Sequence, residues 1–155
     1  MLFQRINRSD PEKVFIVVKN SYSTASLTNG QAAMWDYDTD ADGVAVTKPA
    51  ANAVSHGIAI AGIAAETIAA GSYGLVQVYG YHSAVRCRTI STTGNGSNGF
   101  AQIAQGTPLV QAVTAVFCLE GKDISATNNL HAVGFALTAM TLFTTNAIAA
   151  FIKAM

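Results

Sequence analysis

The sequence has few charged residues, and the two signs balance. Only 12% of its 155 residues are charged, where an average soluble domain has about a quarter, and the formal net charge is zero. A nucleic-acid platform needs a basic face that neutralises phosphates, and the closest basic pair here is Arg86 and Arg88. We therefore expect no DNA or RNA partner.

Residues that usually carry catalysis or bind metals are also scarce. The two cysteines, Cys87 and Cys118, lie far apart in apolar runs, which predicts buried, reduced thiols rather than a disulfide. The three histidines, His56, His82 and His131, lie in or beside apolar runs, and no Cys or His pair has the close spacing of a zinc site. We expect structural histidines and a protein that is not an enzyme, with no catalytic residue, no metal and no cofactor.

Long uninterrupted hydrophobic runs are absent, although half of the residues are hydrophobic. The N-terminal segment lacks the apolar core of a secretion signal, and residues such as His56 and Glu66 interrupt the longest apolar tracts. We therefore expect no membrane partner. So little charge favours a surface that is covered by partners. An ordinary domain rich in Ala and Thr would have the same composition, so composition leaves both interpretations open.

The acidic run DYDTDADG, Asp36–Gly43, matches the first half of a calcium-binding loop. With Asp38 as the first ligand, the twelfth position, where a bidentate Glu should close the loop, is Pro49. Both flanking runs are typical of strands rather than helices. Because Asp and Gly favour tight turns, we predict that Asp40–Gly43 is a hairpin connection. A turn that also binds a weak surface cation is the alternative.

A second motif, Gly94–Gly99, matches the G-x-G-x-x-G pattern of dinucleotide-binding folds. That pattern requires a following helix, and Gly106 and Pro108 would interrupt one early. We therefore interpret Ser91–Gly99 as a flexible loop rich in glycine and asparagine.

Short extended runs between turn residues predict an all-β chain. We expect a single-domain β-sandwich or barrel, jelly-roll-like, with hairpins and the loop above. The segment Ala50–Ala70 could form an alanine-rich helix, but Gly57 and Gly62 favour a strand plus loop. The predicted strands are Lys13–Asn20, Gln31–Tyr37, Gly43–Lys48, His56–Ala61, Gly74–Cys87, Val110–Leu119, His131–Met140 and Ala147–Met155.

The longest predicted strand has apolar residues at both odd and even positions, which is expected of a strand covered on both sides for part of its length. Strict alternation would place Leu75, Gln77, Tyr79, Tyr81, Val85 and Cys87 on one face and Val76, Val78, His82, Arg86 and Arg88 on the other.

Four segments, taken in order, carry a resemblance to a known group of proteins. They are the strand Val14–Asn20, the hairpin Trp35–Gly43, the segment Gly57–Gly80 with its run IAAGSYGLVQVYG, and an ending made of Ala132–Leu137 and Ala150–Met155. Together they resemble the small capsid decoration, or cement, proteins of tailed bacteriophages. The likeness covers most of the chain but neither residues 1–12 nor Ser91–Gly99.

The resemblance implies an all-β virion protein without catalysis on the outer surface of the capsid, assembled in the host cytoplasm. It would bind the major capsid protein and stabilise contacts between its subunits. It would also bind itself as a homo-oligomer, with a trimer favoured over a dimer. The alternatives are a carbohydrate-binding or host-recognition β-sandwich module of a phage particle, or a hydrolase whose site has no recognisable motif.

Residues 1–12 are expected to form an extended N-terminal arm ahead of one β domain, residues 13–155. Pro11 biases Asp10 away from helical geometry. An arm with large apolar side chains has surface to bury, so we expect it to dock on a neighbouring cement or capsid subunit. Packing as an edge strand on its own domain is the alternative. The expected partner-binding residues are Leu2, Phe3, Arg5, Ile6 and Arg8.

Overall fold

The fold consists of β-strands joined by turns, which confirms the all-β prediction. The computed structural model describes residues 12–40, 42–49, 59–88, 102–111, 118–121, 132–141 and 145–154. Within them no helix is long and apolar enough to cross a membrane. The strands are β1 (Lys13–Asn20), β2 (Ala32–Trp35), β3 (Ala45–Thr47), β4 (Ile60–Ala64), β5 (Tyr73–Arg88), β6 (Gln102–Ile103), β7 (Pro108–Gln111), β8 (Leu119–Gly121), β9 (Gly134–Ala136), β10 (Met140–Thr141) and β11 (Thr145–Lys153).

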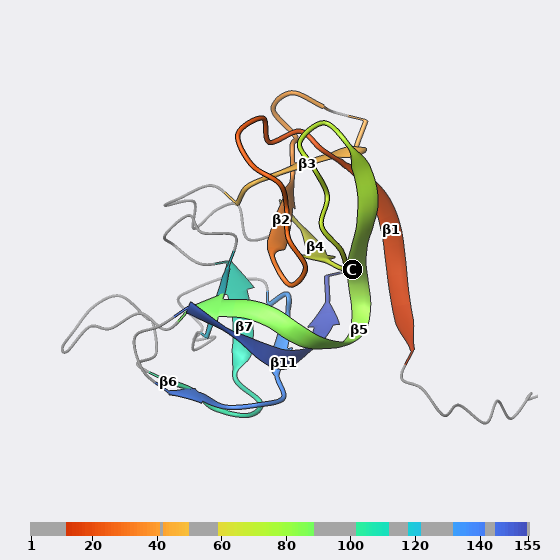
Figure 1. The fold of residues 1–155 in the computed structure, drawn as a ribbon. Coiled ribbons are helices and arrows are strands. Elements are labelled where there is room, and N and C mark those ends of the chain that lie inside the picture. Colours follow the sequence, from red (N-terminus) through yellow and green to blue (C-terminus); the bar gives the residue numbers. More distant parts are fainter. Residues whose placement is uncertain are drawn as a thin grey trace, which may run out of the picture.

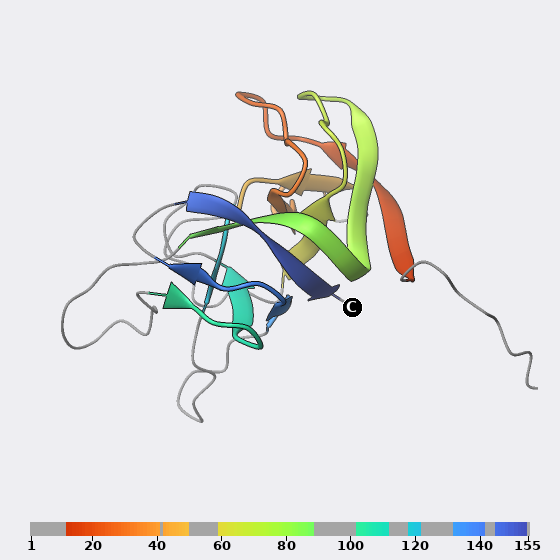
Figure 2. The ribbon, with the colours of Figure 1, turned by 60° about the horizontal axis from the view of Figure 1, so that its bottom comes forward.

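Within the described residues, nine strands form one continuous sheet that closes on itself twice. Its order is β1-β3-β2-β4-β5-β11-β9-β7-β8, and the additional pairings β1–β5 and β5–β8 complete two rings. We call β5-β1-β3-β2-β4 the N-ring and β5-β11-β9-β7-β8 the C-ring. Strand β5 belongs to both, and Figure 1 shows it running beside β1 and then turning alongside β11. Figure 2 shows the same course of β5 from another side.

The change from one ring to the other occurs at Gly80. Strand β1 pairs with β5 from Tyr73 to Gly80, and β11 pairs with β5 from Tyr79 to Arg88. Gly80 has a φ of +100°, and a Cβ at this position would overlap the carbonyl oxygen of Glu12. Glycine is therefore required here, because the start of β1 lies directly against the bend in β5.

Two apolar clusters fill the two rings. The N-ring cluster contains Val18, Leu27, Ala33, Val46, Ala61, Ala64, Ile68 and Val76. The larger cluster lies in the C-ring, and residues of β2 and β4 also contribute to it, including Met34 and Ile63. Strands β2 and β4 are therefore buried on both faces, which explains why their sequences, AAMW and IAGIA, are apolar at every position.

A β-bulge in β5 contradicts the strict alternation predicted for this strand. His82 pairs with Ala150 and Val85 pairs with Ile148, so two residues of β5 stand opposite one residue of β11. The extra residue reverses which side chains point inward. Val85 and Cys87 are therefore buried, whereas Leu75, predicted on their face, is 39% exposed.

The strand predictions are accurate where pairing is local. Strand β1 has the predicted bounds, and the described part of Ala50–Ala70 contains β4 rather than a helix. The predicted strand His56–Ala61 begins outside the described residues and overlaps only the start of β4. The short β6 was not predicted.

Two predicted strands are wrong as single elements. The ends of Val110–Leu119 belong to two separate strands, β7 and β8, which pair with each other antiparallel. His131–Met140 is divided between β9 and β10, because Leu137 and Thr138 leave the sheet and bind the carbonyl oxygen of Ala149. The predicted loop Ser91–Gly99 lies outside the described residues.

Candidate interaction surface

The acidic run joins β2 to β3, two antiparallel strands, and its carboxylates cap backbone groups. Asp40 accepts hydrogen bonds from the backbone N–H groups of Ala45, at 2.6 Å, and Asp42, at 3.3 Å. Asp36 accepts a hydrogen bond from the hydroxyl of Ser21, which is the main reason that its pKa is lowered. Strands β2 and β3 form the predicted hairpin, but the connection between them runs from Asp36 to Val44 and is longer than the predicted Asp40–Gly43. Among the described residues, no group of three Asp, Glu, His or Cys side chains is placed to hold a metal ion.

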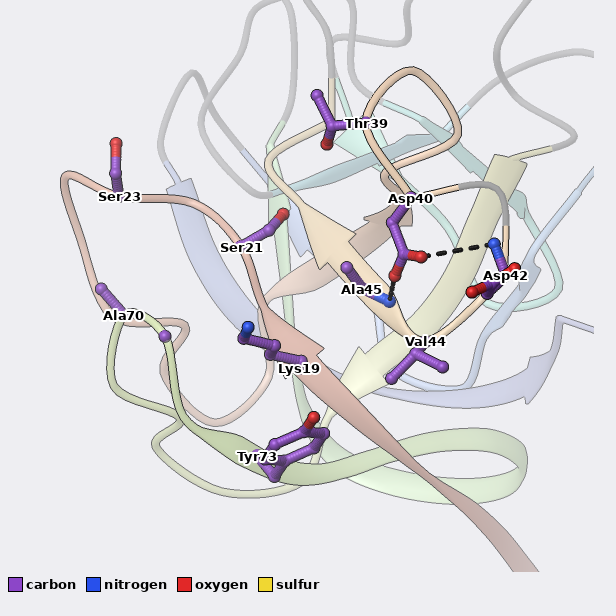
Figure 3. Close-up of a pocket in the computed structure, with 11 residues that line it drawn as sticks. Lys19, Ser21, Ser23, Thr39, Asp40, Asp42, Val44, Ala45, Ala70 and Tyr73 are labelled. Carbon is purple, nitrogen blue, oxygen red and sulfur yellow. Dashed lines mark hydrogen bonds between the residues drawn. The ribbon is translucent and has the colours of Figure 1, made fainter.

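A polar groove of about 780 Å³ lies beside this turn. Figure 3 shows Asp40 and Asp42 on one side of the groove and Lys19 with Tyr73 on the other. The Tyr73 side chain is 64% exposed. The groove therefore combines an accessible aromatic ring with charges of both signs, which suits a polar ligand or the rim of a protein interface.

An apolar stripe continues from the groove along the outer face of β1 and β5. It consists of Phe15, Val17, Tyr73 and Leu75, and we call it the outer stripe. Val17 pairs directly with Leu75 across the two strands, and Lys19 pairs with Tyr73. Val17 is 66% exposed, an unusual position for a valine at the centre of a strand. Contiguous exposed apolar side chains rimmed by charges are typical of surfaces that bind another macromolecule.

The C-ring carries an aromatic ladder on its outside. The ring of Phe151 lies edge-on to that of Tyr79, with centroids 5.1 Å apart, and is stacked with that of Phe135 at 5.4 Å. The ammonium group of Lys13 lies 5.9 Å from the ring centroid of Tyr81. Such pairs prefer these geometries, so the ladder stiffens the outer face of β5, β9 and β11.

The one histidine among the described residues, His82, and both cysteines are buried. His82 is buried, and its Nδ1 accepts a hydrogen bond from the backbone N–H of Ala84 at 3.1 Å. Burial lowers the pKa of His82, which favours the neutral imidazole. Cys87 and Cys118 are buried free thiols, as predicted, and burial raises the pKa of each. His56, His131 and Gly94–Gly99 lie outside the described residues.

The predicted binding residues of the arm also lie outside the described residues, whose first member is Glu12. These five residues are Leu2, Phe3, Arg5, Ile6 and Arg8. Sequence reasoning missed the outer stripe, although a signal was present. In the run VFIVV, Val14–Val18, apolar residues occupy both faces of one strand, and only one of those faces can point into a small ring.

Comparison with known proteins supports the fold. No family model matches the sequence, and no curated protein matches it. The crystal structure of the N base of head fiber gp8.5 from bacteriophage phi29 is similar, with a TM-score of 0.50 and 12% sequence identity. The match covers 92% of this chain and 96% of that chain. At this identity the likeness concerns the fold, and it extends over both rings.

Proposed function

We propose that the protein is a non-enzymatic structural component of a tailed-bacteriophage particle. It binds the outer surface of the capsid and stabilises contacts between subunits of the major capsid protein. The observation that carries this proposal is the fold, which is similar over nearly its whole length to the base of a phage head fiber. A component built for attachment needs a binding face rather than an enclosed pocket, and the outer stripe supplies such a face.

The binding contribution of the outer stripe follows from its exposure. Complete burial of a large apolar side chain contributes about 1.5–3 kcal/mol, and the stripe residues are between 39% and 66% exposed. Each of them therefore has about 1 kcal/mol to gain when a partner covers it. One copy would bind weakly by this face alone, but linked copies on repeated capsid sites would bind with avidity.

Self-association is part of this proposal. Few charges are available to solvate a lone monomer, and we propose a homo-oligomer, with a trimer favoured over a dimer. Light scattering on the purified protein at tens of micromolar checks this. A clean monomer that also fails to associate on the capsid would contradict it.

The proposed attachment can be tested by substituting one stripe residue. Val17→Lys places a charge in the stripe, and Ala147→Lys places the same charge on an exposed strand position of the C-ring. Each variant is added to capsids from a phage strain that lacks the gene, and occupancy is measured by electron microscopy. We expect Val17→Lys to reduce occupancy about fivefold, since the stripe loses about 1 kcal/mol and its neighbours are pushed away from the partner. Equal occupancy by both variants would refute the role of the stripe.

The predicted arm has its own test. Deleting Met1–Ser9 should leave the β domain folded and weaken its retention on capsids during heating. A truncated protein that still occupies every site after heating would show that the arm is not needed.

A second candidate function is carbohydrate or host recognition, and the groove is the observation that favours it. Tyr73 offers an exposed ring on which a sugar can stack, and Lys19 and Asp42 offer hydrogen-bonding groups. Binding of host surface glycans that is lost in Tyr73→Ala, with capsid occupancy unchanged, would favour this function. Loss of capsid occupancy without glycan binding would favour the first.

A further inference from the structure

Among the described residues, strand β1 has an open backbone edge. Of the strands described there, β3 alone pairs with it on the side away from β5, at Lys19 and Asn20. The backbone N–H of Lys19 donates to the carbonyl of Val44 on that side, at 2.9 Å. Backbone groups of alternate residues point to the same edge of a strand, so those of Val17 and Phe15 also point outward. Within the part of the chain that the structure describes, no strand pairs with them there.

The open edge and the outer stripe form one surface. Figures 1 and 2 both show β1 at the margin of the molecule. Natural edge strands are usually protected by charges, proline or a covering segment. Here Lys13 and Lys19 lie at the two ends, but the middle carries the exposed side chains of Phe15 and Val17. Such an edge is suited to strand addition, in which backbone hydrogen bonds supply affinity and apolar pockets supply specificity.

We propose that this edge accepts the arm of a second copy of the protein. The proposal rests on the self-association proposed above and names the segment and the surface that carry it. The eleven residues before Glu12 can extend over about 36 Å, and the open edge from Lys13 to Val18 spans about 20 Å. The arm brings Leu2, Phe3 and Ile6, which can pack beside the stripe.

Charge and backbone geometry both fit this occupant. Arg5 and Arg8 of an incoming arm complement Asp40 and Asp42, which lie in the groove next to the stripe. A copy's own arm would have to reverse tightly just before β1. The favoured two-residue hairpin turns need a positive φ at their first central residue, and the φ of Pro11 is fixed near −65°. Pro11 therefore disfavours a tight hairpin onto the same chain.

Exchange of arms would close an oligomer without a new domain. Each copy donates one arm and accepts one, so the β1 edge of every copy is covered when the copies form a closed oligomer. Covering the edge would also remove the exposed strand that otherwise invites aggregation.

Cross-linking between introduced cysteines tests the exchange in the full-length protein. The test variant combines Ile6→Cys with Val17→Cys, and the matched control combines Ile6→Cys with Ala147→Cys. Cys87 and Cys118 are buried, so they should react slowly with a short bismaleimide. We expect about tenfold more covalent dimer and trimer from the test variant than from the control, because a docked arm holds the two thiols at a high effective concentration.

The other outcomes overturn the proposal. A bridge within one chain, seen as a monomer that has lost both introduced thiols, would show that the arm docks on its own domain. Covalent dimers from Val17→Cys alone, in the amount given by the test variant, would show that two β1 edges pair directly. Equal yields from test and control variants would show that the arm has no preferred site. Circular dichroism confirms that each variant is folded, and capsid occupancy, measured separately, shows whether the capsid role survives.

Discussion

Replacing Gly30 with alanine tests how the two rings are held together. Gly30 lies in the turn before β2, with a φ of +86°, and its carbonyl oxygen accepts a hydrogen bond from the backbone N–H of Arg86 at 2.8 Å. A Cβ at Gly30 would overlap the carbonyl oxygen of Ala84, a backbone atom of the β5 bulge. The substitution must therefore push this turn away from the C-ring half of β5.

The expected loss of stability has two parts. A left-handed conformation costs alanine about 1–2 kcal/mol more than glycine. Displacing the turn also weakens the hydrogen bonds that Gly30 makes with Ala64 and Arg86, and leaving such buried groups unpaired costs about 1–3 kcal/mol. The sum is about 2–5 kcal/mol, or a fall in Tm of about 5–20 °C for a chain of this size.

Gly106→Ala is the matched control. Gly106 has a φ of +81°, and a Cβ there would meet no heavy atom within 4 Å. It should lose only the backbone part, about 1–2 kcal/mol. Urea unfolding followed by circular dichroism measures both variants. If their free energies of unfolding differ by less than about 0.5 kcal/mol, the contact between the Gly30 turn and the bulge does not hold the rings together.

Three further predictions concern the turn and the thiols. Removing divalent cations with EDTA should leave Tm unchanged, because backbone N–H groups occupy the carboxylate of Asp40; a fall of several degrees would show that the run Asp36–Asp42 binds a cation. Asp40→Ala should lower the free energy of unfolding by about 1–2 kcal/mol in urea, since two capping hydrogen bonds are lost, whereas Asp38→Ala, at an exposed neighbouring position, should change it by less than about 0.5 kcal/mol. Cys87 and Cys118 should react with a thiol reagent at pH 8 only after unfolding, because burial raises the pKa of both; rapid labelling of the native protein would contradict their placement.

Local sequence signals predicted much of the fold. Strand β1 ends at Asn20, whose side chain donates a hydrogen bond to the carbonyl of Ile68 at 3.0 Å. The residue type that predicted the end of the strand therefore also stabilises it. The Asp40 turn was predictable because its hydrogen bonds reach only two to five residues along the chain. Hydrogen bonds between residues that are close in sequence can be predicted from the residue types alone.

Long-range pairing was not predictable from the same signals. The bulge between His82 and Val85 exists because β5 must meet β11, about sixty residues later in the chain, and nothing in the letters YHSAVRC marks it. The closure of the rings by the β1–β5 and β5–β8 pairings has no local signature either. The outer stripe depended on this closure, because only a closed ring decides which face of Phe15 and Val17 remains outside.

The sharing of β5 between the rings has a mechanical consequence. A pull between β1 and β11 acts along two sets of ladder hydrogen bonds on one backbone, Lys13–Lys19 on one stretch and Thr145–Lys153 on the other. Strands loaded along their length must break many of these bonds together, whereas strands peeled from one end break them singly. If copies are anchored through β1 on one side and through the C-ring on the other, tension between the two anchors would pass through the backbone of β5. The protein would then resist extension, because many hydrogen bonds along β5 would have to break at once.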